Sequence, residues 1–218
     1  MDYIIMCGGS YSHMSKPKAM FEINGEKLIE RTIRLLNENG ISNKNIIISS
    51  NYEAFDNFGV KRISNEKNNW QWVNKKSIGY WLDAFLPYDK KCTYLYGDVY
   101  YSEAAIKTII EKANIVTENT LAGSAIAKNT LGKNWGEPFA FIVPKPLTFH
   151  AGIKAVKKIQ DEGGLTRGYA ITWELYRFLN NLDINIQAVK DETFFVIDDE
   201  TIDIDTEEEL QKLLDKIK

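Results

Sequence analysis

The sequence predicts an α/β domain with a mainly parallel central sheet flanked by helices. Short apolar runs that end at glycine or polar residues, typical of strands buried on both faces, alternate with segments whose apolar residues recur at helical spacing. No linker, repeat or low-complexity tract interrupts the 218 residues, a length that fits one domain. We therefore expect a single domain over residues 1–218.

The first fifty residues predict a strand, a helix and a second strand. Tyr3–Cys7 is a continuous apolar run that stops at two glycines, which is typical of a buried strand. Apolar residues then recur at helical spacing from Leu28 to Leu36, and Gly40 lies where a helix C-cap is expected. Asn45–Ser50 is a second apolar run. This order is typical of a right-handed βαβ unit.

The alternation continues to the end of the chain. Further strands are expected at Thr93–Tyr96, Leu121–Ala127, Phe139–Val143, Ile184–Val189 and Thr193–Ile197. Helices are expected from 74 to about Phe85, from Ser102 to Lys112, at Ile153–Ile159, at Ala170–Leu179 and from Thr206 onward, where Thr206 and Glu209 form a capping box. We expect Tyr3–Cys7, Asn45–Ser49 and Thr93–Tyr96 to be neighbouring parallel strands. The less regular residues 129–168 are expected to add a lid or subdomain.

Composition excludes several classes of protein. With 27 basic and 30 acidic side chains the net charge is −3, so a dedicated nucleic-acid binder is disfavoured. Two cysteines and two histidines without a CxxC pattern argue against a disulfide framework or a structural zinc site. No apolar run reaches the length of about 18 residues needed to span a membrane. We expect a cytoplasmic protein without a membrane partner; a homo-oligomer stays open.

The loop that follows the first strand carries candidate phosphate-binding groups. Gly8, Gly9 and Ser10 lie at the carboxyl end of a buried strand, where open α/β sheets bind ligands. Glycine lets backbone N–H groups approach phosphate oxygens closely, and Lys16 and Lys18 supply positive charge. Neither the GxxxxGK[ST] nor the GxGxxG pattern is present. The alternative is an ordinary glycine turn with solvated lysines.

Two acidic segments are candidates for binding a cation. The strand Thr93–Tyr96 ends at Gly97-Asp98, which places a carboxylate in the same crevice, although an aspartate that starts a turn is the alternative. Asp203 and Asp205 alternate along a short apolar segment and are expected on one face of a strand. Asp205 alternatively only helps to start the last helix.

The order of these features resembles the nucleotidyltransferases that make nucleotide-sugars and CDP-alcohols. The similarity rests on an apolar strand with Gly8-Gly9, then Lys16-Pro17-Lys18, then a glycine turn at Gly25 before a helix, and the late Ile204-Asp205-Thr206. The short choline-phosphate and sugar-phosphate cytidylyltransferases are the most similar branch. The resemblance implies a GT-A-like fold with a mixed, mainly parallel sheet. It also implies transfer of a nucleotide from an NTP, with CTP the first choice, to a small phosphorylated acceptor such as a sugar phosphate or phosphocholine, with release of pyrophosphate.

The resemblance also assigns roles to residues. Lys18 would be catalytic and bind the α-phosphate region, and Asp98 and Asp205 would hold Mg²⁺, with Asp203 as the rival of Asp205. The nucleotide would be bound by Cys7, Gly8, Gly9, Ser10, Lys18 and Asp98, and by Asn74 and Ser77 near the base. The acceptor would contact Glu137, Trp173 and Glu174.

The chain departs from the family at one point. The family usually reads Gly-x-Gly-x-Arg in the first loop, and here Ser10 stands at the second glycine and no arginine follows. His13 or Lys16 would have to substitute, and neither has the planar fork of a guanidinium. Two other classes therefore stay open: a non-catalytic nucleotide-binding domain and a glycosyltransferase of similar fold, although Asp98-Val99-Tyr100 lacks the Asp-x-Asp pattern of the latter.

Overall fold

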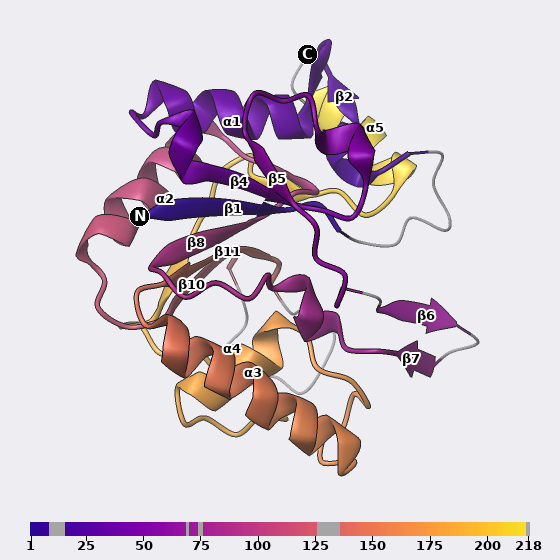
Figure 1. Cartoon of the computed structure of the whole chain (residues 1–218), viewed down its shortest axis with the longest axis vertical. Helices are drawn as coiled ribbons and strands as arrows, with labels where there is room; N and C mark the ends of the chain where they lie inside the picture. The colour runs from indigo at the N-terminus through magenta and orange to yellow at the C-terminus, as the bar shows by residue number, and fades with distance from the viewer. Residues whose placement is uncertain (9–15, 69, 74–75, 126–135, 217–218) are drawn as a thin grey trace.

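A seven-stranded mixed sheet runs through the centre of the molecule (Figure 1). The computed structural model describes residues 1–8, 16–68, 70–73, 76–125 and 136–216. The strands of the sheet are β1 (Asp2–Met6), β4 (Ile46–Ser49), β5 (Lys61–Ile63), β8 (Cys92–Tyr96), β10 (Thr120–Gly123), β11 (Pro138–Val143) and β12 (Phe194–Val196). Their spatial order is β12-β10-β11-β8-β1-β4-β5.

The parallel part of the sheet confirms the predicted strand neighbours. β1 pairs in parallel with both β4 and β8, and β4 pairs in parallel with β5. Tyr3, Ile4 and Ile5 are buried because helices cover both faces of this central strand. β11 is antiparallel to both β8 and β10, which makes the sheet mixed, as the GT-A-like fold implies. The order reverses between β1 and β8, so a crevice is expected at their carboxyl ends.

Two pairs of helices cover the two faces of the sheet (Figure 1). α1 (Leu28–Glu38) and α2 (Glu103–Ile115) pack on one face through Ile29, Ile33 and Ile106. On the other face lie α3 (Pro146–Asp161) and α4 (Thr172–Leu179), whose buried residues include Phe149 and Trp173. No helix of the described residues is long and apolar enough to cross a membrane.

Three short antiparallel pairs lie outside the main sheet. They are β2 (Glu22–Ile23) with β3 (Glu26–Lys27), β6 (Gln71–Val73) with β7 (Lys76–Ile78), and β9 (Val99–Tyr100) with β13 (Ile202–Asp203). Single 3₁₀ turns lie at Lys18–Met20, Asn43–Asn45, Glu53–Phe55 and Trp81–Ala84. A third apolar cluster packs the last helix, α5 (Glu207–Lys216), and β13 against β2 and β9 through Ile23, Tyr100, Ile204 and Leu213.

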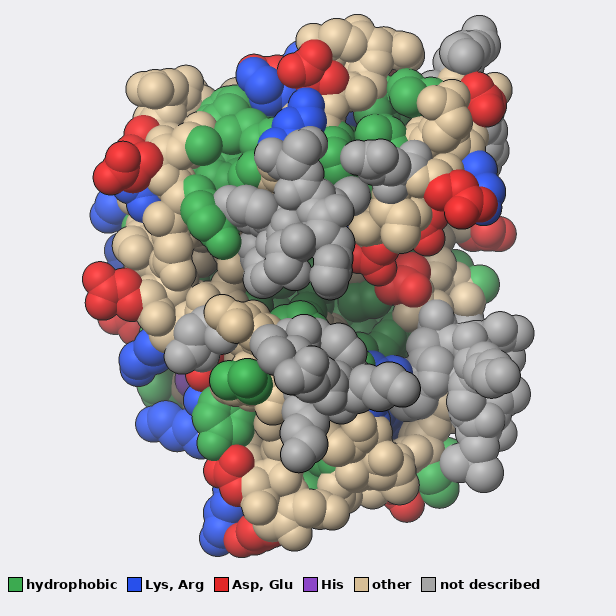
Figure 2. Space-filling model, turned by 90° about the vertical axis from the view of Figure 1, so that its right-hand side faces the viewer, with side chains coloured by type: hydrophobic (Ala, Val, Ile, Leu, Met, Phe, Trp, Pro, Cys, Tyr) green, Lys and Arg blue, Asp and Glu red, His purple; other side chains and the backbone are tan. Residues whose placement is uncertain are grey.

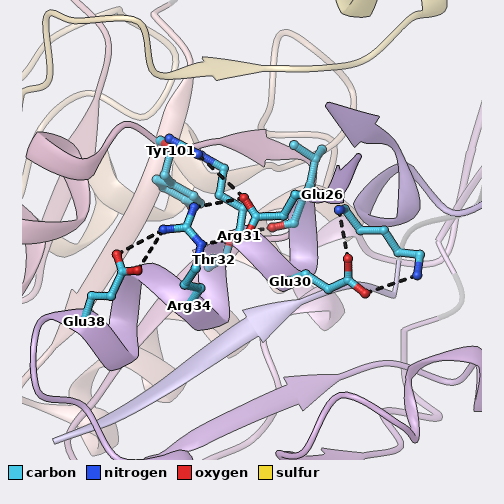
Figure 3. Close-up of polar contacts among 9 residues, drawn as sticks. Glu26, Glu30, Arg31, Thr32, Arg34, Glu38 and Tyr101 are labelled. Atoms are coloured by element: carbon cyan, nitrogen blue, oxygen red, sulfur yellow. Dashed lines mark hydrogen bonds and ion pairs between the residues drawn. The ribbon is translucent and has the colours of Figure 1, made fainter. Parts of the chain in front are cut away.

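Polar contacts fix α1 against its neighbours (Figure 3). Both carboxylate oxygens of Glu26 accept from the Arg34 guanidinium at 2.7 and 2.9 Å, so the β2–β3 hairpin is tied to the helix. Arg31 Nε donates to the backbone oxygen of Tyr101 at 2.9 Å, and Glu30 accepts from the Lys27 N–H at the helix start. These bonds join the β2–β3 hairpin and α1 to the residues that follow β8.

Several predicted helix ends are confirmed at atomic detail. Ser102 Oγ accepts from the Ala105 N–H at 2.8 Å, which makes Ser102 the N-cap of α2. Thr206 and Glu209 form the reciprocal bonds of a capping box at the start of α5. Gly40 has φ of +84°, the left-handed conformation expected just after α1.

Several predicted elements differ from the structure. The strand expected at Leu121–Ala127 is β10, which ends at Gly123. The helix expected from 74 to Phe85 is wrong: the chain forms the β6–β7 hairpin and then a 3₁₀ turn. Ile184–Val189 is not a strand, because Gln187 turns inward to bond Arg177 while Ile184 and Val189 pack on the core below α4. α3 is longer than Ile153–Ile159 because Pro146 can begin it one turn and more earlier.

The range 129–168 is only partly described. Its described part contains β11, a strand of the main sheet, and α3, which covers one face of that sheet. Residues 126–135 lie outside the described residues. The expected acceptor-side lid or subdomain therefore stays a prediction.

Gly97 is predicted to tolerate no side chain. A Cβ atom there would lie 2.6 Å from the Met6 carbonyl oxygen and 2.6 Å from Cys7 Sγ, and the first of these belongs to the backbone of the central strand. Gly97→Ala should lower the free energy of unfolding by about 1–3 kcal/mol, because β1 and β8 would have to separate. Urea denaturation measures this loss. Unchanged stability would show that the two strand ends move apart freely.

Candidate active site

A cleft of about 370 Å³ opens at the carboxyl ends of β1 and β8, where the strand order reverses. Figure 2 shows a hollow on this side of the molecule, with apolar side chains deep inside and acidic side chains at its margin. The described residues that line it are Met6, Cys7, Gly8, Pro17, Lys18, Ala19, Asn68, Trp70, Trp81, Ala84, Tyr96, Gly97, Asp98, Glu137, Pro138, Arg167, Tyr169, Ile171, Thr172, Asp203 and Asp205. Mixed apolar and charged lining is typical of a small-molecule site.

Lys18 is the basic side chain at the centre of the charged part of the cleft. It begins a 3₁₀ turn directly after Pro17, whose fixed φ sets the direction of approach. Lys18 Nζ lies 3.2 Å from Asp98 Oδ2 and also pairs with Asp205 Oδ1. Burial alone would lower the pKa of Lys18, but Asp98 and Asp205 outweigh it and raise that pKa. Lys18 is therefore charged over the whole physiological range.

Three carboxylates meet beside Lys18. One oxygen each from Asp98, Asp203 and Asp205 lies within 4.8 Å of the others. Burial, together with the charges of Asp98 and Asp205, holds the pKa of Asp203 well above its usual range. Asp203 Oδ1 is buried and has no hydrogen-bond partner within the described part of the chain. This donor set fits Mg²⁺, which prefers carboxylate oxygens and would satisfy the unpartnered one.

The backbone explains how residues a hundred positions apart come together. β13 pairs antiparallel with β9, and the Ile204 N–H donates to the Asp98 carbonyl at 3.0 Å. Ile204 itself is buried in the third apolar cluster. The strand expected around Asp203 and Asp205 is β13, which ends at Asp203 and belongs to a separate two-stranded ladder rather than to the main sheet. The pairing of β13 with β9 nevertheless places Asp203 and Asp205 beside Asp98.

The floor of the cleft is built from two closely packed strand ends. Gly97 N–H donates to the Met6 carbonyl at 3.0 Å, and Asn68 Nδ2 donates to the Gly8 carbonyl at 3.0 Å. Cys7 lies beneath Gly97, and burial with the nearby Asp98 raises the pKa of its thiol well above the usual value. Cys7 is thus a packing residue with a protonated thiol at neutral pH. Gly9, Ser10 and His13 lie outside the described residues.

The two residues predicted to lie near the base have different positions. Asn74 lies outside the described residues. Ser77 is part of β7 rather than a helix, and its Oγ accepts from Trp70 Nε1 at 2.8 Å. Trp70, not Ser77, lines the cleft. Ser77 therefore positions an aromatic wall of the site.

Of the three predicted acceptor residues, the structure brings only Glu137 to the cleft. The surrounding protein and the carboxylates of Asp205, Glu209 and Asp98 raise the pKa of Glu137. Trp173 is buried in the core and donates through Nε1 to the Gly136 carbonyl. Glu174 is buried against Arg177, with Oε1 2.5 Å from Nη2, while Oε2 caps α4 at the Ile171 N–H. Trp173 and Glu174 thus do not line the cleft; they pack in the core behind the residues that do.

Sequence reasoning missed Arg167 and the part of the aromatic lining that Tyr96 supplies. Tyr169 and Trp70 meet across the cleft with ring centroids 6.1 Å apart, and Arg167 Cζ lies 5.6 Å from the Tyr169 ring. Trp81 and Tyr96 stack at 6.2 Å on the floor. In the sequence, Arg167 is a charged residue between two glycine-containing turns just before a helix. This pattern is typical of an ordinary loop, so it did not identify Arg167 as a site residue.

Comparison with known proteins points to one family. Residues 3–167 match the family model described as the MobA-like NTP transferase domain. No curated protein sequence matches the chain. The matched residues include Lys18, Asp98 and Arg167, whereas Asp203 and Asp205 lie beyond them.

Solved structures are similar to the chain over nearly its whole length. CTP:phosphocholine cytidylyltransferase (LicC) from Streptococcus pneumoniae is 17% identical with a TM-score of 0.56, covering 100% of this chain and 99% of the other. 4-Diphosphocytidyl-2C-methyl-D-erythritol synthase from Anaerococcus prevotii is 14% identical with a TM-score of 0.56, and coverage is 99% and 95%. Inositol-1-phosphate CTP transferase from T. maritima is 14% identical with a TM-score of 0.52 at the same coverage. At these identities the similarity shows the fold.

The buried Glu174–Arg177 pair is predicted to stabilise the protein. Glu174→Gln leaves the Arg177 charge buried without a counter-charge, so the free energy of unfolding should fall by about 3 kcal/mol. Chemical denaturation measures this.

Glu162→Gln is the matched control for this pair. Glu162 pairs with Lys158 on the exposed surface of the molecule at 3.7 Å, so its loss should cost less than about 0.5 kcal/mol. A Glu174→Gln variant that keeps its stability but loses substrate binding would instead support the prediction that Glu174 contacts the acceptor.

Proposed function

The chain belongs to the MobA-like NTP transferase family, and we propose that it is a Mg²⁺-dependent cytidylyltransferase that acts on a small phosphorylated acceptor. The observation that carries this proposal is the meeting of Lys18, Asp98 and Asp205 in one cleft at the switch point of the sheet. A positively charged side chain beside carboxylates that can hold a metal ion suits the transfer of a nucleotidyl group from a highly charged triphosphate. Gly8 provides close backbone approach on the neighbouring strand.

In the proposed reaction, an oxygen of the acceptor phosphate forms a bond to the α-phosphorus of the NTP. The bond from the α-phosphorus to the α–β bridging oxygen breaks, and pyrophosphate leaves with that oxygen. Lys18 stabilises the negative charge on the α-phosphate oxygens during the transfer. The backbone of Gly8, with Gly9 and Ser10 beyond the described residues, binds the nucleotide. Mg²⁺ held by Asp98 and Asp205 would neutralise charge on the reacting phosphates.

The choice of CTP is supported by fold similarity to enzymes whose names include CTP or cytidylyl transfer. The acceptor is a sugar phosphate, phosphocholine or a similar small phosphorylated molecule. The aromatic lining by Trp70 and Tyr169 suits either an apolar sugar face or an alkylammonium group. The cleft volume of about 370 Å³ is in the range typical of small-molecule sites.

A pyrophosphate-release screen of four NTPs against a panel of phosphorylated acceptors tests the proposal. We expect release that depends on Mg²⁺, on CTP and on one class of acceptor. Hydrolysis of a nucleotide-sugar without pyrophosphate chemistry would indicate a glycosyltransferase instead. Tight binding of CTP without turnover for any acceptor would indicate a regulatory domain.

The charged groups of the cleft are predicted to differ in their effect on turnover. Asp98→Asn and Asp205→Asn should each lower kcat by about 10²–10³-fold, since each removes a charge that acts on the reacting phosphates. Lys18→Ala should have a similar effect, and Asp203→Asn a milder one. Steady-state kinetics with the best substrates measure these ratios. Full activity of Asp98→Asn would refute the assignment.

Metal binding is predicted to show in stability without any substrate. Mg²⁺ should raise the melting temperature of the native protein, since a ligand that binds only the folded state stabilises it. Asp98→Asn and Asp205→Asn should lose this rise, whereas Asp89→Asn, an exposed aspartate outside the cleft, should keep it. An equal rise in all variants would place the metal elsewhere.

Asp203→Asn is predicted to stabilise the metal-free protein. The folded state raises the pKa of Asp203, so ionisation of Asp203 destabilises the fold as the pH rises above the ordinary value of 3.8. In EDTA, the stability advantage of Asp203→Asn should therefore grow with increasing pH. Thermal melts from pH 4 upward measure it, and an advantage that shrinks as the pH rises would contradict the burial of an ionisable group.

A further inference from the structure

The sheet order divides the cleft into two halves on either side of Asp98. Gly8 and Asn68 follow β1 and β5, on one side of β8. Glu137, which precedes β11, and the α3–α4 segment with Arg167 and Tyr169 lie on the other side. In the proposed function, Gly8 in the first half lies beside the nucleotide phosphates. The proposed function thus leaves the second half for the acceptor.

We propose that Arg167 binds the phosphate group of the acceptor and orients it for attack. This inference rests on the proposed function, because it assigns a substrate group to the second half of the same cleft. Arg167 and Lys18 are the basic side chains among the described lining residues. Lys18 pairs with Asp98 and Asp205, at the boundary between the two halves. Arg167 lines the cleft from the α3–α4 segment of the second half.

The charge of the cleft makes such a cation necessary. Asp98, Glu137, Asp203 and Asp205 all line it, so a phosphate monoester approaching from this side meets four carboxylates. The raised pKa of Glu137 reflects its neighbouring carboxylates, and Arg167 is close enough to act on that pKa in the opposite direction. A guanidinium binds phosphate through two parallel N–H···O bonds, which fixes orientation as well as position.

The Tyr169 ring holds the Arg167 guanidinium in place, and Glu174 occupies the other position in this half of the cleft that would attract an anion. Arg167 lies over the Tyr169 ring at 5.6 Å, and the Tyr169 ring packs in turn against Trp70. The N-terminus of α4 also reaches this half of the cleft and would attract an anion. The Glu174 carboxylate already accepts from the Ile171 N–H there, so this position is taken. Arg167 thus supplies the guanidinium that the first loop lacks, but from the acceptor side.

Calorimetric titration with methyl phosphate, the smallest phosphate monoester, tests the assignment. The protein is titrated with Mg²⁺ present, with and without saturating α,β-methylene-CTP, which fills the nucleotide half and resists transfer. Variants are Arg167→Met, Arg167→Lys and, as the matched control, Arg62→Met on β5 outside the cleft. Melting temperatures confirm that each variant is folded.

Arg167→Met should raise the dissociation constant for methyl phosphate by about tenfold to a hundredfold, the loss expected for hydrogen bonds to a charged group. Arg167→Lys should lie between native and Arg167→Met, because it keeps the charge without the fork. Arg62→Met should match the native protein. The affinity for α,β-methylene-CTP should be unchanged in all variants.

Three results would overturn the inference: no binding of methyl phosphate to the native protein at millimolar concentration, equal binding by Arg167→Met, or a loss confined to α,β-methylene-CTP. The last would assign Arg167 to the triphosphate. Failure of the proposed function is distinct from these, since it appears as absent pyrophosphate release or absent analogue binding in the native protein. The Arg167 effect is still measured in the titration without the analogue.

Discussion

The ion pairs of Lys18 with Asp98 and Asp205 are the interaction on which the arrangement of the cleft depends. Three carboxylates within 4.8 Å of one another repel strongly in a partly buried site, and an ammonium group among them offsets that repulsion. Without a counter-charge, a cluster of carboxylates in a partly buried site lowers the stability of the folded state. Its presence in a cleft, rather than on an open surface, is what points to chemistry.

The architecture around the cluster serves to hold these charges at close range. Gly97 lets β8 turn directly against Met6, so that Asp98 leaves the sheet beside Lys18. The bond from Ile204 to the Asp98 backbone then sets Asp203 and Asp205 next to it. The Glu26–Arg34 and Arg31–Tyr101 contacts in Figure 3 tie the helix after Lys18 to the chain after Asp98. The strand ends, the β2–β3 hairpin and α1 thus all help to fix the positions of the charged side chains in the cleft.

The sequence predicted those features that depend on local physics. Buried parallel strands, the Ser102 cap and the Thr206–Glu209 box follow from burial and hydrogen bonding within a few residues. The β6–β7 hairpin and the Ile184–Val189 segment were misread, because short apolar patterns do not reveal whether a partner strand exists. Trp173 and Glu174 read as acceptor residues, yet tertiary packing turns both inward. Arg167 could not be predicted from the sequence, because only tertiary packing brings this loop arginine to the cleft.

The ladder between β9 and β13 also has a consequence for how the charged cluster is assembled. Lys18 and Asp205 are separated by 187 positions, so the cluster joins segments from opposite ends of the sequence. A molecule whose sheet has formed but whose segment after β12 has not docked lacks two of the three carboxylates. The cluster therefore exists only when this late segment is folded onto β9.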